Sequence, residues 1–89
     1  MKPPAISRKD VDDVIREALR GAAKYGPFNS AHEGYAVLLE EVDELWDWVK
    51  KRPSKRDLAA MRNEAKQVAA MALRFMQDCC NAPKKGKRK

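Results

Sequence analysis

Cysteine and histidine are scarce in this sequence, which limits the chemistry that it can support. The 89 residues include two cysteines and one histidine. Cys79 and Cys80 are adjacent, a geometry that discourages a disulfide between them, and there is no Cys-x-x-Cys or Cys/His cluster. Zinc binding and thiol redox chemistry therefore have no support, and we interpret Cys79 as a small apolar residue at the end of a helix.

Long apolar runs are missing as well. No segment approaches the roughly 20 apolar residues that span a bilayer, and the N-terminus lacks the apolar core of a signal peptide. We therefore expect no membrane contact and a cytoplasmic location. The composition, 44% hydrophobic and 36% charged, fits one small folded helical domain better than a disordered chain.

Most of the excess positive charge lies in a short C-terminal segment. The formal net charge is +6, and residues 84–89 contribute +5 of it, whereas residues 1–83 hold 14 basic and 13 acidic side chains. We expect residues 1–83 to form a single helical domain and residues 84–89 to be a disordered basic tail. Such a tail could contact nucleic acid without specificity, but as a solvated terminus it needs no partner. We therefore do not expect a nucleic-acid-binding protein.

Three segments combine a helix start signal with apolar residues at helical spacing. The first helix is expected to begin after Ser7, a good N-cap, and to end near Gly26. A capping box at Ser30 opens the second helix, which is predicted to run to about Lys51. The third helix is predicted to start at Ser54 in the same manner, after a tight connection.

The third helix is apolar on more than one row, which favours contact with more than one neighbour. The first row is Leu58, Met61, Ala65, Val68, Ala72, Phe75 and Cys79. The second row, beside the first, is Ala60, Glu64, Gln67 and Met71. Three helices from one chain offer few such neighbours. We expect an all-α fold in which the second and third helices form a long antiparallel hairpin, and hairpins of a homodimer or homotetramer pair into a four-helix-bundle core.

Three glutamates, Glu40, Glu41 and Glu44, share one stripe of the second helix, opposite its apolar side. Like charges this close repel one another, and a hard divalent cation with oxygen ligands is the simplest way to relieve the repulsion. The alternative is an acidic face in solvent, the usual fate of a charge run. The spacing by itself leaves both interpretations open.

The predicted hairpin brings further oxygen atoms to this stripe. Positions equally far from the turn lie level with each other, so Glu44 faces the level of Glu64, and Glu41 faces that of Gln67. Four oxygen-bearing side chains from two helices would then converge, as they do in metal sites inside helical bundles.

These residues give the chain a resemblance to the MazG-like nucleotide pyrophosphohydrolases, within the all-α NTP pyrophosphatase group. The resemblance rests on a Glu-Glu-x-x-Glu motif at Glu40, Glu41 and Glu44 and, after a gap of 19 residues, on Glu64 as the first residue of a Glu-x-x-Asp motif. It covers about residues 10–80. Two further segments, 24–30 and 32–35, are similar to short phage and mobile-element members.

The resemblance implies hydrolysis of an NTP or dNTP between its α- and β-phosphates, giving a monophosphate and pyrophosphate, as nucleotide-pool housekeeping. It implies Mg²⁺, or alternatively Mn²⁺, as the cofactor, held by Glu41, Glu44, Glu64 and the position of Gln67. Glu40 would ligate a second ion or orient the attacking water, so that Glu40 and Glu41 are the expected catalytic residues. Metal ions neutralise the triphosphate and raise the fraction of attacking hydroxide.

Gln67 departs from the family pattern, which has Asp at this position. An amide oxygen can bind Mg²⁺, but it brings no negative charge and binds more weakly. Either Glu40 or Glu33 compensates for the missing charge, or catalysis is impaired. The alternative function is therefore a noncatalytic helical oligomer that retains the fold as a binding or regulatory module.

Three residues are candidates for substrate contact. Asn29 and His32, at the start of the second helix, carry hydrogen-bonding groups suited to a base or sugar, and Lys24 could meet phosphates. His32 alternatively lies at the surface where the helix begins, and Lys24 alternatively caps the first helix. The base preference does not follow from the sequence.

Overall fold

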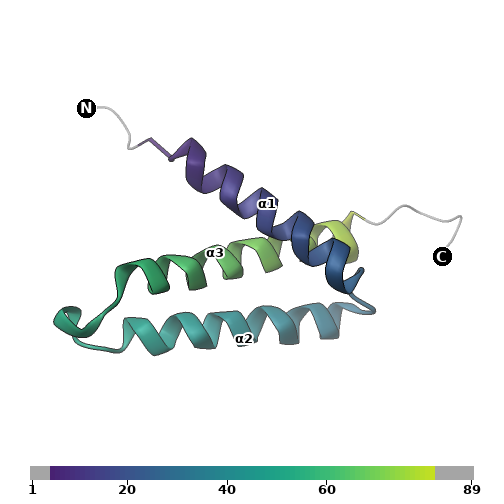
Figure 1. Cartoon of the computed structure of the whole chain (residues 1–89). Coiled ribbons are helices and arrows are strands. Elements are labelled where there is room, and N and C mark those ends of the chain that lie inside the picture. The colour runs from purple at the N-terminus through teal and green to yellow at the C-terminus, as the bar shows by residue number, and fades with distance from the viewer. Residues whose placement is uncertain (1–4, 82–89) are drawn as a thin grey trace, which may run out of the picture.

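The computed structural model describes residues 5–81, and this part of the chain is helical without any strand (Figure 1). It contains three α-helices, α1 (Arg8–Tyr25), α2 (Ala31–Val49) and α3 (Leu58–Phe75). A 3₁₀ turn, Pro53–Lys55, lies between α2 and α3, and a π-helical turn, Met76–Cys80, continues α3. The predicted basic tail, and the last residues of the predicted 1–83 domain, lie outside the described residues.

The starts of α1 and α2 confirm the caps read from the sequence. The Ser7 hydroxyl accepts a hydrogen bond from the backbone N–H of Asp10 at 3.3 Å, and the Ser30 hydroxyl accepts one from that of Glu33 at 3.0 Å. Each bond satisfies one of the amides that a helix start leaves unpaired. Gly26 ends α1 with a φ of 75°, a conformation that favours glycine.

The predicted start of α3 at Ser54 is wrong. Ser54 belongs to the 3₁₀ turn, and the cap is Asp57, whose carboxylate accepts a hydrogen bond from the backbone N–H of Ala60 at 3.1 Å. The chain uses the turn to reverse direction, and Arg56 then donates to the carbonyl of Val49 at 2.6 Å. That bond satisfies a carbonyl left free at the end of α2, which ends at Val49, slightly before the predicted Lys51.

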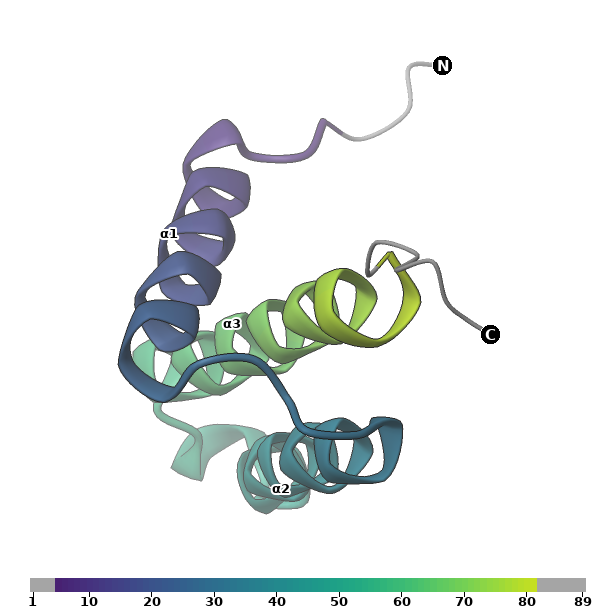
Figure 2. The same cartoon turned by 90° about the vertical axis from the view of Figure 1, so that its right-hand side faces the viewer.

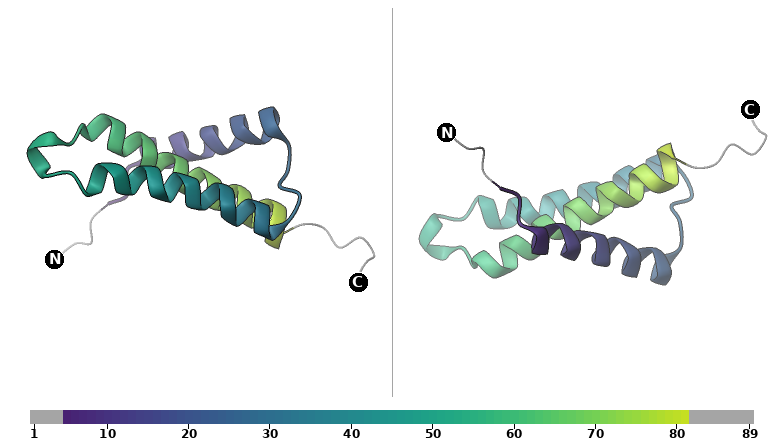
Figure 3. Two further views of the ribbon diagram at one scale, coloured as in Figure 1. Left: turned by 90° about the horizontal axis from the view of Figure 1, so that it is seen from below. Right: turned by 90° about the horizontal axis from the view of Figure 1, so that it is seen from above.

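α3 is the central helix, since it contacts both α1 and α2 (Figure 2). α2 and α3 form the predicted antiparallel hairpin, and α1 crosses α3 obliquely (Figure 3). The buried core consists of Ala18, Ala70 and Met71, and half-buried Val14, Phe28, Val37, Leu38 and Leu73 pack against it. Of the two rows predicted on α3, Met71 lies in this core, whereas Leu58 is 69% exposed, so the core covers only part of the two rows. The pairing of hairpins from two copies stays a prediction.

The connection between α1 and α2 lies against the C-terminal end of α3. The backbone N–H of Phe28 donates to the carboxylate of Asp78 at 3.0 Å. At Gly34, a Cβ would lie 2.8 Å from the Phe75 ring and 3.0 Å from the Phe28 ring, closer than packed atoms can approach. Gly34 therefore allows the start of α2 to pack closely on the end of α3.

Ion pairs join the start of α1 to α3. Arg62 on α3 pairs with Asp10 and with Asp13, the latter at 2.9 Å. Hydrogen bonds from Lys9 and then from Arg62 lower the pKa of Asp13 to about 2.

None of the helices described is long and apolar enough to cross a membrane.

Candidate metal centre and adjoining pocket

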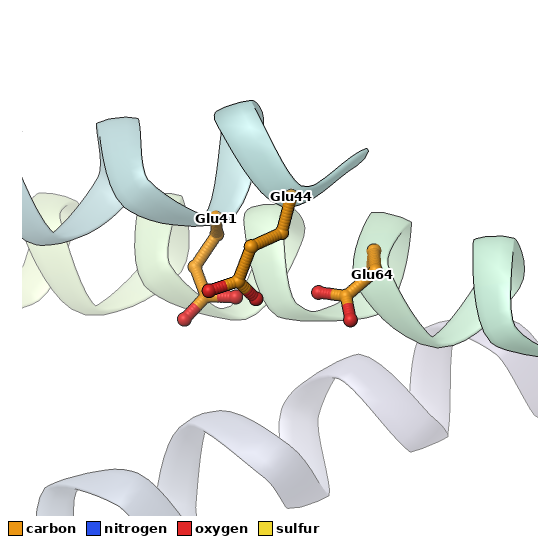
Figure 4. A group of neighbouring side chains, drawn as sticks. All are labelled: Glu41, Glu44 and Glu64. Atoms are coloured by element: carbon orange, nitrogen blue, oxygen red, sulfur yellow. The ribbon is translucent and has the colours of Figure 1, made fainter. Parts of the chain in front are cut away.

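Three carboxylates converge where α2 runs beside α3. Glu41 and Glu44 lie one turn apart on α2, and Glu64 comes from α3. Each contributes an oxygen atom, and these atoms all lie within 4.8 Å of one another. Their side chains point to the same side of the hairpin (Figure 4). The hairpin register predicted from the sequence thus brings Glu44 and Glu64 together.

The pKa values of Glu41 and Glu64 are both raised, by burial first and then by neighbouring carboxylates. Burial is the largest cause of the raised pKa of Glu41, followed by repulsion from Glu44 and Glu64. Burial likewise raises the pKa of Glu64, with hydrogen bonding and repulsion from Glu44 as the next causes. Within residues 5–81, no lysine or arginine forms an ion pair with any of the three. In the described part of the chain, no ion pair offsets their negative charge.

The donor set fits a hard divalent cation. Mg²⁺ prefers oxygen ligands, keeps several of its waters, and is commonly bound by few carboxylates together with substrate phosphates. The set contains no nitrogen or sulfur donor of the kind that zinc and copper favour. An ion here would also relieve the mutual repulsion that raises the pKa values of Glu41 and Glu64.

A pocket of about 500 Å³ opens beside the carboxylates, and Glu41 belongs to both. All three helices and the connection between α1 and α2 contribute to its walls. The lining residues are Glu17, Arg20, Gly21 and Tyr25 from α1, Gly26, Pro27, Phe28 and Asn29 from the connection, Glu33, Val37, Glu40 and Glu41 from α2, and Gln67, Met71 and Arg74 from α3. The carboxylate group therefore has space for a small organic ligand next to it.

Glu40 and Gln67 line this pocket, and Glu40 lies outside the group of three converging carboxylates. Gln67 faces a residue that the sequence analysis missed, since a hydrogen bond with Gln67 contributes to the lowered pKa of Glu17. The largest cause of that lowered pKa is Arg20, which donates to the Glu17 carboxylate at 2.6 and 3.2 Å. α1 thus places a carboxylate beside Gln67, but an arginine already neutralises it.

The three candidate substrate residues are placed differently. Asn29 lines the pocket, where its backbone N–H donates to Glu33 at 2.5 Å and its side-chain amide lies 3.4 Å from the same carboxylate. Glu33 is therefore engaged at the helix start rather than free to replace the charge missing at Gln67. His32 and Lys24 are exposed and are not among the described residues that line the pocket. The Lys24 ammonium instead lies 5.2 Å from the centre of the Tyr25 ring.

Glu17 and Arg74 are pocket residues that the sequence reasoning did not select, although each carried a signal. Arg74 continues, at a three-residue step, the α3 row formed by Glu64, Gln67 and Met71. Glu17 lies four residues before the buried Gly21, so both share the packed face of α1.

Comparison with models of known protein families, with curated proteins and with solved structures found no match for this chain.

Proposed function

We propose that this protein is a Mg²⁺-dependent nucleoside triphosphate pyrophosphohydrolase, which converts an NTP or dNTP to the monophosphate and pyrophosphate. The observation that supports it is the group of Glu41, Glu44 and Glu64 beside a pocket that shares Glu41. The carboxylates provide the oxygen ligands that Mg²⁺ needs, and the pocket provides room for the rest of a nucleotide. A nucleotide-hydrolysing role is also consistent with the cytoplasmic location expected from the sequence.

The residues divide into two tasks under this proposal. Glu41, Glu44 and Glu64 hold the cation, with the Gln67 amide oxygen as a weaker, uncharged ligand. When bound, Mg²⁺ neutralises phosphate charge and increases the fraction of hydroxide available for attack. Glu40, on the pocket wall next to Glu41, accepts a hydrogen bond from the attacking water and so orients it. Water is added across the anhydride bond between the α- and β-phosphates, and pyrophosphate leaves.

The assembly predicted from the sequence belongs to the same proposal, and an exposed apolar row on α2 supports it. Five apolar side chains on α2 are between 39% and 60% exposed and recur at steps of four and three residues: Tyr35, Leu39, Val42, Trp46 and Val49. This heptad row is what one helix presents to another in a coiled coil. Its burial against the same row of a second copy would give a homodimer with a four-helix core, or a homotetramer by repetition.

The assembly is tested by light scattering on wild type and on Trp46→Asp. Wild type is expected to have at least twice the monomer mass of 10.1 kDa. The variant is expected to be a folded monomer, because its new carboxylate is exposed to water in the monomer and would be buried without a partner only in the assembly. Leu58→Asp is a matched control, since Leu58 is 69% exposed on α3, away from the row. A stable wild-type monomer would rule out this assembly.

The second candidate function is the noncatalytic module, which the surroundings of Gln67 favour. Gln67 brings no charge, and its neighbour Glu17 is already paired with Arg20. If the cation site is too weak for catalysis, the pocket still binds a nucleotide without hydrolysing it.

Release of pyrophosphate separates the two functions. Wild type is incubated with each common NTP and dNTP in the presence of Mg²⁺ or Mn²⁺, and Glu41→Gln is compared with Asp43→Asn, which removes one negative charge from the same helix outside the carboxylate group. Hydrolysis by wild type and Asp43→Asn, with a loss of at least about a hundredfold in Glu41→Gln, is the result expected of the enzyme. An inert wild-type protein would leave the noncatalytic module as the better account.

A further inference from the structure

Arg74 is a buried cation whose hydrogen-bonding capacity is largely unused. It is 6% exposed, and no carboxylate in the described part of the chain forms an ion pair with it. One terminal nitrogen donates to the carbonyl of Gly26 at 2.9 Å. Among residues 5–81, the other meets only the thioether sulfur of Met71 at 3.7 Å, a weak acceptor, and Nε has no hydrogen-bond partner. A guanidinium buried in this way is costly to the folded protein unless another acceptor reaches it.

The guanidinium is nevertheless held in one place. Its central carbon lies 4.5 Å from the centre of the Phe28 ring, which gives a cation–π contact. On the other side, a Cβ at Gly21 would lie 3.1 Å from a terminal nitrogen of Arg74, so the glycine leaves room for the guanidinium. With the bond to Gly26, these contacts fix the group before any ligand binds, which makes a hydrogen bond to a ligand less costly in entropy.

Arg74 lies at the end of the pocket away from the carboxylates. It is ten residues beyond Glu64 on α3, which corresponds to about 15 Å along the helix axis. The pocket lining there includes the apolar Val37 and Met71, which pack together in the core cluster. Glu33 also lines the pocket, but it bonds to Asn29 instead of Arg74. The pocket thus has an acidic end beside the three carboxylates, and a second end, here called the apolar end, where Arg74 lies among mainly apolar residues and Glu33 is bonded to Asn29.

We propose that Arg74 recognises the base of the nucleotide by donating a hydrogen bond to a ring carbonyl oxygen. The inference rests on the proposed function, which assigns the phosphates to the acidic end and so leaves the base for the apolar end. Apolar walls suit a flat base and would leave phosphate oxygens without solvation. The terminal nitrogen that meets only sulfur is the donor available for the ligand.

This chemistry defines a class of substrate. Guanine, hypoxanthine, cytosine, uracil and thymine all carry a ring carbonyl, whereas adenine carries none. A site that hydrogen-bonds one substrate group discriminates strongly against an analogue without it, because the buried donor is then left unpaired. For a charged donor we expect a preference of about tenfold to a hundredfold for carbonyl-bearing bases over adenine.

The sharpest comparison is dITP against dATP, which differ in the group at C6 and in the proton on N1. Wild type is expected to hydrolyse dITP with a kcat/KM at least about tenfold higher than that for dATP. Arg74→Lys keeps the charge but loses the planar guanidinium, and it should bring the kcat/KM values for dITP and dATP within about threefold of each other. Arg20→Lys makes the same change at the pocket arginine that α1 contributes, and it should leave the ratio unchanged. Gly21→Ala, which adds a methyl group against the guanidinium, should lower the ratio without removing it.

Two results would overturn the inference. They are equal kcat/KM values for dITP and dATP in wild type, and an unchanged ratio of the two values in folded Arg74→Lys. If both kcat/KM values fall by the same factor in Arg74→Lys, Arg74 contacts phosphate instead. Binding of dIMP and dAMP by calorimetry separates this inference from the proposed function. If nothing is hydrolysed yet dIMP binds at least about tenfold more tightly, the function fails and base recognition stands; equal binding removes base recognition as well.

Discussion

The first half of α3 lies open, whereas its second half is packed between α1 and α2. Leu58, at the start of the helix, is 69% exposed, while Ala70 and Met71, in the second half, are 0% and 6% exposed. The carboxylate of Glu64 belongs to the open half, and Arg74 to the packed half. Within one helix, the half-buried Glu64 thus lies nearer the exposed start, and Arg74 lies in the buried half.

The largest expected effect is a loss of stability on substitution in the packed half of α3. Met71→Ala should lower the free energy of unfolding by about 2 to 5 kcal/mol, because it leaves a cavity in a small core. Leu58→Ala, in the open half, should change it by less than about 1 kcal/mol, since most of that side chain is already in water. Urea unfolding of both variants measures the difference. Equal costs would show that the two halves are not packed differently.

Gln67 lies between the two halves of α3, and its replacement tests whether this position contributes to the proposed cation site. Gln67→Asp supplies the anionic oxygen that hard cations prefer, so Mg²⁺ should bind about tenfold more tightly than in wild type. Titration calorimetry measures the affinity, and Gln67→Asn, which shortens the side chain without adding charge, is the control. Turnover need not rise, because a tighter ground-state complex does not favour the transition state by itself. Unchanged affinity in Gln67→Asp would place Gln67 outside the cation site.

The smallest effect concerns how the stability contributed by Glu41 and Glu64 depends on pH, measured in the presence of a chelator. Because burial and repulsion raise the pKa of Glu41 and of Glu64 in the folded state, the folded protein holds these protons more tightly than the unfolded chain. Their contribution therefore favours folding below the usual glutamate pKa of 4.5 and is lost as the pH rises through the higher folded values. Glu41→Gln should thus unfold at a slightly higher temperature than wild type at pH 7, and the difference should vanish near pH 4. A variant less stable than wild type at pH 7 would contradict this sign.

Local signals in the sequence were enough for much of the fold. Ser7, Ser30 and Gly26 each act within one turn of their own helix end, so the limits of α1 and the start of α2 could be predicted. The predicted start of α3 was wrong because Ser54 and Asp57 are equally good caps. The 3₁₀ turn decides between them, and it depends on how the chain reverses direction.

The candidate site likewise has a part that the sequence predicts and a part that it does not. The approach of Glu44 to Glu64 follows from the register of an antiparallel hairpin, which sequence spacing specifies. The roles of Glu17 and Arg74 depend on where α1 crosses α3, and periodicity along one helix does not specify that crossing. Periodicity also could not decide which apolar row of α2 is covered, and Trp46 proves to be 57% exposed.

The measurement that tests the account most directly is a calorimetric titration of the protein with Mg²⁺, repeated with Mn²⁺. Wild type and Asp43→Asn are expected to bind the cation, and Glu64→Gln is expected to lose binding, because it removes the one carboxylate that α3 contributes to the converging group. No binding by wild type, or equal binding by wild type and Glu64→Gln, would contradict the assignment of Glu41, Glu44 and Glu64 as a metal centre.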